Sequence, residues 1–260
     1  MRNSTYLVKL EKKILDIGIK KGSTVIICAD VLRFAIFLKR KKINFNSNDF
    51  IDLLIKIVGK NGTLIFYSFN WNFFSGKLFN YNLSKSFSGA LSNAALQRKD
   101  FKRSKSPVYS LMVFGKHQKK ICNMSHYDCF SLKSPFGFLI KIKAKCFLFD
   151  LDYKTGAFPF FHVAEQFIKV YYRFFKIFSG NIMVGNLFKK ISIKMFVRKN
   201  DYKITTIYSN KTDTALKKIN ALKTNNFFNI KISLLDVRKL YLMTLEQLKI
   251  EKKMILRKKS

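Results

Sequence analysis

Two amphipathic helices alternate with two short apolar strands in the first third of this chain, and this alternation limits the folds open to it. Apolar residues at helical spacing predict helices over residues 6–19 and 50–58, and glycine-containing turns end both of them. Residues 24–28 and 63–67 are apolar almost throughout, which is typical of strands buried on both faces of a sheet. We therefore expect an α/β fold with a central, mostly buried sheet flanked by helices.

The rest of the chain continues with strands and helices and contains one long loop. The loop spans residues 69–87, is rich in aromatic and polar residues, and contains the only tryptophan, Trp71. Asn48 or Asp49 is the expected N-cap of the helix over residues 50–58. The expected strands are residues 111–114, 145–150, 191–196 and 205–208, and the expected helices are residues 89–96, 162–174, 216–222 and 234–248. No repeat or low-complexity linker interrupts this pattern, so we expect a single domain over residues 1–260 with a basic C-terminal tail from about residue 249.

The charge of the chain is strongly unbalanced. Lysine and arginine outnumber the acidic residues by 50 to 15, which gives a formal net charge of +35. Such a charge favours polyanionic partners in general. However, lysine, phenylalanine, isoleucine and asparagine, which AT-rich codons encode, are abundant together, and the lysines are spread along the whole chain. Both observations favour codon bias over nucleic-acid binding as the origin of the charge.

Cysteine usage and the N-terminal sequence bear on the cellular compartment. The four cysteines show no CxxC spacing, so we expect reduced thiols and not a disulfide framework. Residues 1–5 lead into a charged amphipathic stretch, and no apolar run is long enough to span a membrane. These features predict a cytoplasmic protein without a signal peptide or a transmembrane segment.

Four possible metal ligands, His117, Cys122, His126 and Cys129, lie close together in the sequence. Their spacing matches no familiar structural zinc motif, and the glycine motifs that bind phosphate, such as the P-loop, are absent from the sequence. We therefore expect no metal site.

His162 and Glu165 are the strongest candidates for chemistry. They lie three residues apart, so on a helix they share one face. A neutral imidazole beside a carboxylate can accept a proton from an amine or a hydroxyl near neutral pH. The pattern His-x-x-Glu is short and common, so its interpretation depends on the surrounding sequence.

Five sequence blocks in one order supply that context. They are residues 15–34 with Asp30, residues 62–91 with Asn70-Trp71, residues 103–115 with Ser106-Pro107 and Ser110, residues 128–149 with Ser134-Pro135-Phe136, and residues 162–165 with His162-Val163-Ala164-Glu165. Together they resemble the aminoglycoside 3-N-acetyltransferase family over about two-thirds of the chain, and more weakly in residues 172–176. The resemblance is greater to members acting in amino-sugar pathways of surface polysaccharides than to the antibiotic-modifying members.

This resemblance implies an N-acetyltransferase that moves an acetyl group from acetyl-CoA, its co-substrate, to an amine. The implied acceptor is an amino sugar, free or nucleotide-linked. His162 would be the general base and Glu165 would orient it. The residues implied to contact acetyl-CoA are Asp30, Ser110 and Ser134, and those implied to contact the acceptor are Asn70 and Trp71.

The chain departs from the family pattern at Cys28-Ala29, in place of a His-Ser pair, and at Ser131, in place of a glycine. Ser106 replaces a histidine that the antibiotic-modifying members carry before the proline, which disfavours an aminoglycoside acceptor. Two alternatives remain open: an aminoglycoside 3-N-acetyltransferase, and a degenerate, non-catalytic basic binding protein. Formation of a homo-oligomer also stays open.

Overall fold

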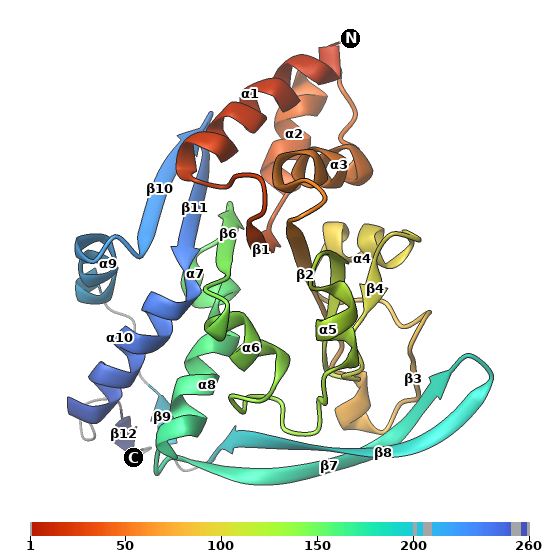
Figure 1. Cartoon of the computed structure of the whole chain (residues 1–260), viewed down its shortest axis with the longest axis vertical. Helices are drawn as coiled ribbons and strands as arrows, with labels where there is room; N and C mark the ends of the chain where they lie inside the picture. Colours follow the sequence, from red (N-terminus) through yellow and green to blue (C-terminus); the bar gives the residue numbers. More distant parts are fainter. Residues whose placement is uncertain (1, 200–201, 205–209, 251–255, 259–260) are drawn as a thin grey trace.

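A seven-stranded mixed sheet forms the centre of the computed structural model, which describes residues 2–199, 202–204, 210–250 and 256–258 (Figure 1). The strand order is β10-β11-β6-β1-β2-β5-β4. β1 pairs in parallel with both β2 and β6, whereas the outer strands pair antiparallel. The strands are β1 (Thr24–Ala29), β2 (Thr63–Phe69), β4 (Lys102–Arg103), β5 (Tyr109–Gly115), β6 (Lys145–Phe149), β10 (Leu222–Phe227) and β11 (Ile230–Asp236).

Helices cover both faces of this sheet and bury two separate sets of apolar side chains. Successive residues of a strand point to opposite faces, so apolar strands such as β1 supply both sets. One face is covered by α1 (Arg2–Ile17), α2 (Leu32–Arg40), α3 (Ser47–Val58) and α4 (Ala90–Leu96). The other face is covered by α5 (Gln118–Asn123), α6 (Pro135–Lys141), α7 (Tyr153–Gly156), α8 (Phe158–Ile168), α9 (Asn210–Lys218) and α10 (Val237–Ile250). This arrangement confirms the predicted α/β class.

A long hairpin runs along the base of the molecule in Figure 1. It consists of β7 (Arg173–Val184) and β8 (Leu187–Arg198), and β7 also pairs in parallel with the short β3 (Phe79–Asn80). A smaller two-stranded sheet joins β9 (Tyr202–Ile204) to β12 (Leu256–Lys258), and a 3-10 helix η1 (Asn72–Ser75) lies in the predicted long loop. The hairpin begins just after α8, and it therefore places its first residues beside that helix.

Several predicted boundaries are wrong. The helix expected over residues 162–174 begins at Phe158 and ends at Ile168, because Lys169 adopts a left-handed conformation with φ +56 and the chain then enters β7. The N-cap of α3 is Asn46, whose side chain accepts a hydrogen bond from the backbone N–H of Asn48. Residues 234–235 belong to β11 and residue 222 to β10, although both were expected in helices, and α2 was not predicted.

Parts of two predictions lie outside the described residues. These are the expected strand over residues 205–208 and most of the expected basic tail, whose first lysine, Lys249, lies in α10. None of the described helices combines the length and the apolar character that a membrane crossing requires.

Candidate active site

α8 holds the predicted base and carboxylate on one face. His162 Nδ1 lies 2.7 Å from Glu165 Oε2. The Glu165 side chain is 2% exposed, whereas the His162 side chain is 24% exposed. One turn of helix therefore places a buried carboxylate behind an imidazole that solvent, or a substrate, can reach.

The start of β7 completes the surroundings of Glu165. The Tyr172 hydroxyl donates a hydrogen bond of 2.9 Å to Glu165 Oε1, and Arg173 Nε forms an ion pair of 2.9 Å with Glu165 Oε2. Burial alone would raise the pKa of Glu165. The hydrogen bond from His162, the charge of Arg173 and the Tyr172 hydroxyl together hold the pKa below its ordinary value. Glu165 is therefore an ionised, fixed carboxylate.

The protonation of His162 follows from these contacts. Burial lowers the pKa of His162 below its ordinary value, although Glu165 acts in the opposite direction, so the imidazole is neutral at pH 7. An ionised carboxylate can only accept a hydrogen bond, so the single imidazole proton lies on Nδ1. Nε2 then carries a free lone pair, and it has no hydrogen-bond partner within the described part of the chain. This is the geometry that a general base requires.

Aromatic rings connect His162 to the loop that follows β2. The His162 ring lies 5.1 Å from that of Phe130 and 5.6 Å from that of Phe158, between centroids. Further ring contacts of 4.9–5.9 Å lead from these two rings to Trp71, which is 39% exposed. We call this set of rings the aromatic wall, and its members are Phe69, Trp71, Tyr109, Phe130 and Phe158. The rings of Phe69, Tyr109 and Phe130 are buried, so the wall packs behind the base and exposes the Trp71 ring at its far end.

Asn70 fixes the position of the wall's exposed end. It is buried at the carboxyl end of β2, where its Nδ2 donates to the Lys85 carbonyl at 2.8 Å and its Oδ1 accepts from the Asn72 N–H at 2.9 Å. Both contacts are internal to the loop. In this structure Asn70 anchors the loop and Trp71 presents a surface.

The three residues expected to contact acetyl-CoA lie on or next to three different elements. Asp30 is exposed at the carboxyl end of β1 and accepts from the Leu32 N–H, and buried Ser134 is the N-cap of α6 and accepts from the Gly137 N–H. Ser110 is fully buried on β5. It lies two residues before Met112, so its side chain points to the same face of the sheet, which α1–α4 cover. No hydrogen bond or ion pair within the described part of the chain joins any of the three to His162, and their contact with acetyl-CoA stays a prediction.

A buried arginine forms a hydrogen bond with the hydroxyl of Ser110. Arg103 Nε donates to Ser110 Oγ at 2.9 Å, and its other nitrogens donate to the carbonyls of Ser68, Tyr81 and Ser84. Burial lowers the pKa of Arg103 to about 10, because none of these partners is a carboxylate. Ser110 thus belongs to a buried network that ties β4 and β5 to the long loop.

The substituted family positions have structural roles here. Ser106 is fully buried, and its Oγ accepts from the N–H groups of Val108 and Tyr109, at 3.3 and 2.9 Å. Cys28 lies in the core with its sulfur 3.7 Å from that of Cys146, Ala29 ends β1, and the Ser131 carbonyl accepts from the Ser134 N–H. All four cysteines are buried free thiols, and the described residues contain no metal-binding cluster of His, Cys, Asp and Glu side chains.

Sequence reasoning missed Tyr172 and Arg173 as partners of Glu165. A signal existed, because the weak extension of the family resemblance covers residues 172–176. Their role depends on the turn from α8 into β7, which periodicity alone did not predict. The wall residues Tyr109 and Phe130 lie within the third and fourth blocks and Phe158 lies outside all five, but nothing distinguished them among 28 phenylalanines and 11 tyrosines.

Fold and site together define an α/β protein with a neutral histidine, held by a buried carboxylate and positioned to accept a proton. The family model for aminoglycoside 3-N-acetyltransferase matches residues 37–249. The chain belongs to this family, and the prediction of an N-acetyltransferase is confirmed at that level.

Solved structures of aminoglycoside acetyltransferases share the fold. AAC(3)-Xa has a TM-score of 0.76 and 15% identity, covering 94% of this chain and 92% of its own. AAC-IIIb, solved as a binary complex with CoASH, has a TM-score of 0.76 and 15% identity, covering 94% and 96%. A mutant of AAC(3)-IVa in complex with apramycin has a TM-score of 0.73 and 18% identity, covering 95% and 93%. Among curated proteins, none matches this sequence.

Proposed function

We propose that this protein transfers the acetyl group of acetyl-CoA to an amine of an amino sugar, with His162 as general base and Glu165 as its orienting carboxylate. The observation that carries the proposal is the 2.7 Å contact between His162 Nδ1 and Glu165 Oε2, which leaves Nε2 unprotonated and accessible. The related acetyltransferase bound to CoASH supports acetyl-CoA as the co-substrate.

The proposed reaction passes one proton through Nε2, from the amine to the departing sulfur. The amine nitrogen attacks the thioester carbonyl, a C–N bond forms and the C–S bond breaks, so that coenzyme A leaves as a thiol. His162 Nε2 takes the proton that the attacking nitrogen must lose, and the imidazolium can pass it to the departing sulfur. Glu165 stabilises that imidazolium, since the carboxylate already holds Nδ1–H in place.

The acceptor class rests on the site's surface and on Ser106. The exposed Trp71 ring at the end of the aromatic wall suits stacking against a sugar ring, whose carbon-bound face is apolar. Ser106 is buried and bonded within its own turn, so it offers no side chain to an acceptor. We therefore favour an amino sugar of a surface-polysaccharide pathway, free or nucleotide-linked, acetylated in the cytoplasm.

An aminoglycoside acceptor is the second candidate, because the chain belongs to the family named for that reaction and a related enzyme binds apramycin. Acetyl-CoA consumption, followed as thiol release, separates the two when amino sugars, nucleotide-linked amino sugars and aminoglycosides are compared as acceptors. Preference for either sugar class supports the proposal. Preference for aminoglycosides replaces it with the second candidate.

A non-catalytic basic protein would behave differently in the same assay. It would release no thiol with any acceptor, but it would bind nucleic acid with an affinity that falls steeply as salt rises. That combination of results would overturn the enzymatic proposal. Size-exclusion chromatography with light scattering addresses the oligomeric state.

A further inference from the structure

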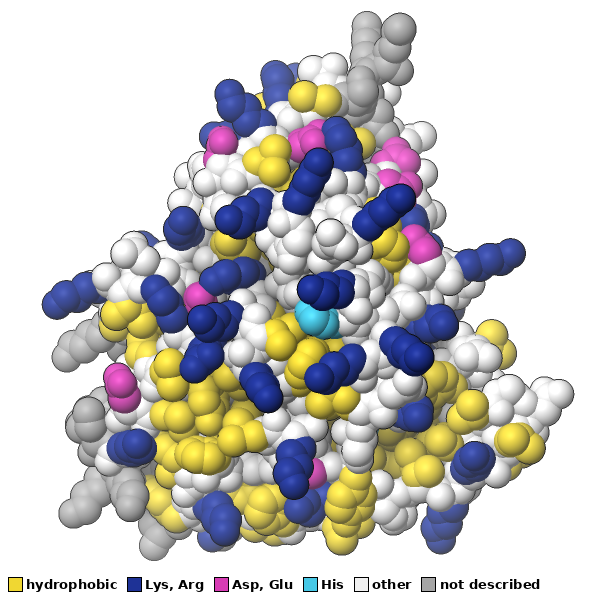
Figure 2. Space-filling view, in the orientation of Figure 1, with side chains coloured by type: hydrophobic (Ala, Val, Ile, Leu, Met, Phe, Trp, Pro, Cys, Tyr) yellow, Lys and Arg dark blue, Asp and Glu magenta, His cyan; other side chains and the backbone are white. Residues whose placement is uncertain are grey.

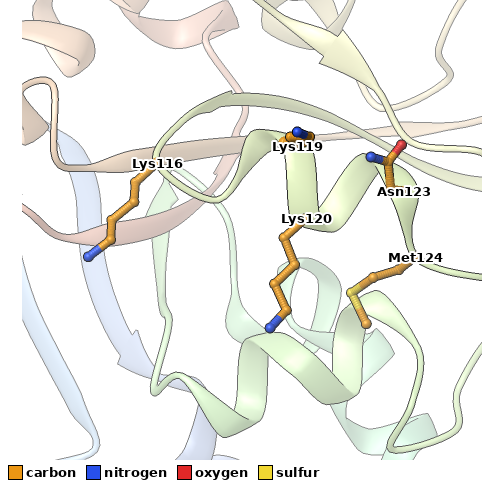
Figure 3. A pocket seen from close by; sticks show the side chains of 5 residues that line it. All are labelled: Lys116, Lys119, Lys120, Asn123 and Met124. Carbon is orange, nitrogen blue, oxygen red and sulfur yellow. The ribbon is translucent and has the colours of Figure 1, made fainter.

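Two adjoining pockets form a basic groove beside α5. The first has a volume of about 470 Å³ and is lined by Lys116, Lys119, Lys120, Asn123 and Met124 (Figure 3). The second has a volume of about 380 Å³ and shares Asn123 and Met124 with the first. We call the first the lysine pocket and the second, which His126 lines, the histidine pocket. Because they share two residues, a single elongated ligand can occupy both.

The lysine pocket concentrates positive charge that no described carboxylate neutralises. Figure 3 shows the side chains of Lys116 and Lys120 extending away from α5, and Lys120 Nζ lies 4.7 Å from the centroid of the Phe138 ring on α6. None of the three lysines forms an ion pair with a described residue. In Figure 2 dark-blue side chains are spread over the face shown, including its centre. Three unpaired ammonium groups within five residues of sequence favour the binding of an anion that carries more than one charge.

His126, which lines the histidine pocket, has a buried polar atom without a partner among the described residues. His126 is 7% exposed, and its Nε2 has no hydrogen-bond partner among the described residues. Burial, and secondarily the charge of Lys105, lowers the pKa of His126 to about 4, so the ring is neutral. A buried polar atom left unpaired is unfavourable in free energy, and a bound ligand that hydrogen-bonds to it removes that penalty. Lys105 also lines this pocket and adds a fourth ammonium group.

We propose that the basic groove binds the phosphate groups of a small phosphorylated ligand, with the lysine pocket holding the phosphates and His126 Nε2 hydrogen-bonding to the adjoining part. This inference rests on the proposed function, in which either coenzyme A or a nucleotide-linked acceptor supplies such phosphates. The length of the connecting chain limits how far the histidine pocket can lie from the base. His126 and Phe130, whose ring contacts His162, are four residues apart, so their Cα atoms are at most about 14 Å apart.

Calorimetry with four probes tests the lysine pocket. Coenzyme A is compared with pantetheine, which lacks its phosphates, and UDP is compared with uridine. The variant is Lys116→Gln/Lys120→Gln, and the matched control is Lys39→Gln/Lys41→Gln, two exposed lysines at the end of α2 on the opposite side of the sheet. We expect the variant to bind the relevant phosphorylated probe about tenfold more weakly, as when one charge-assisted hydrogen bond is lost, while the control binds normally.

Each outcome has a defined meaning. A loss for coenzyme A alone assigns the groove to the acetyl donor, and a loss for UDP alone assigns it to the acceptor. Equal affinities in the variant and the control, or no binding of either phosphorylated probe by the unmodified protein, overturn the proposal. Acetyl transfer that persists unchanged in the variant, at subsaturating concentrations of both substrates, would reject the groove while leaving the proposed function intact.

His126 is tested separately by two replacements. His126→Gln keeps an amide nitrogen near the position of Nε2, whereas His126→Leu removes the polar atom. We expect His126→Leu to lower affinity for the same probe about fivefold, the effect of one neutral hydrogen bond, and His126→Gln to retain most of it. Leucine removes an unpartnered polar atom, so the melting temperature should not fall. Equal binding by His126→Leu and the unmodified protein would exclude His126 from the site.

Discussion

His162 can act as a base only while it is neutral, and its neighbours act on its protonation in opposite directions. Burial and Arg173 lower its pKa, and Glu165 raises it. The same carboxylate also fixes the tautomer, because it accepts the proton of Nδ1 and thereby directs the lone pair of Nε2 outward. Glu165 thus orients the base, and the burial of the imidazole together with the charge of Arg173 keeps it neutral.

Replacing His162 with glutamine tests the base directly. The amide nearly fills the imidazole's place but cannot accept the proton, so we expect kcat to fall about 100- to 10,000-fold. The affinity for acetyl-CoA, measured by calorimetry, and the melting temperature should stay close to those of the unmodified protein. Glu11→Gln, which disrupts an exposed ion pair with Lys56, serves as a distant control. A His162→Gln variant with more than a tenth of the original kcat would mean that another group is the base.

Arg173 should contribute to the lower pH limit of activity, together with the burial of His162. The ordinary pKa of histidine is about 6.5. Because the pKa of His162 is lowered, we expect kcat/KM to fall only when the pH decreases below that value. Removing the Arg173 charge in Arg173→Met should raise the His162 pKa, because a nearby cation disfavours the imidazolium, and so move this limit to higher pH.

The matched controls for Arg173 are Arg173→Lys, which keeps the charge, and Arg198→Met, which changes the exposed arginine opposite it on β8. Neither should move the pH limit. If all three variants show the same pH dependence of kcat/KM as the unmodified protein, Arg173 has no electrostatic effect on His162.

At the scale of elements, the end of β5 depends on a glycine. Gly115 has φ +91, and a Cβ there would clash with the carbonyl oxygen of Gly62, so that backbone would have to move to make room. Gly76 has φ +74, but a Cβ at that residue would meet no atom within 4 Å. Alanine meets the same left-handed strain at both sites, about 1–2 kcal/mol, but only Gly115→Ala adds the clash.

Urea unfolding measures this difference. We expect Gly115→Ala to reduce the free energy of unfolding by about 1–3 kcal/mol more than Gly76→Ala, the usual effect of overpacking. Equal losses in the two variants would mean that the backbone at Gly62, just before β2, can move away from Gly115 without cost.

How well the sequence predicted the elements depends on which interactions determine each of them. The strands β1 and β2 were predicted within two residues, because an apolar run between turns reflects burial on both faces. The end of α8 was not, since residues 167–178 are aromatic and apolar and suit a helix or a strand equally well. The left-handed conformation of Lys169 and the pairing of β7 with β8 determine where the helix ends, and local periodicity shows neither.

In the candidate site too, contacts within one helix were predictable from the sequence, whereas contacts between elements were not. The spacing of His162 and Glu165 was enough to predict their contact, because both lie on one helix turn. Tyr172 and Arg173 reach Glu165 from another element, so their role required the tertiary structure. Ser110 is the converse case, because the family resemblance suggested a ligand contact and the fold engages its hydroxyl with Arg103.

At the scale of the whole molecule, the net charge of +35 predicts a protein that salt stabilises. Even if every one of the 15 acidic residues paired with one cation, most of the 50 basic residues would stay unpaired and repel one another. Figure 2 shows lysine and arginine over the whole of one face. Raising KCl from 10 to 150 mM shortens the Debye length from about 30 to about 8 Å, which screens that repulsion more than it weakens the few close ion pairs.

We therefore expect the melting temperature to rise over this range, by about 2–4 °C for each kcal/mol of repulsion that is screened. Lys39→Glu/Lys41→Glu lowers the net charge, so it should melt higher at 10 mM KCl and gain less from added salt. Chloride bound in the basic groove could raise the melting temperature as well, but the gain would then disappear in Lys116→Gln/Lys120→Gln, whereas general repulsion leaves most of it. A melting temperature that stays constant or falls with salt would mean that the positive charges do not destabilise the folded protein.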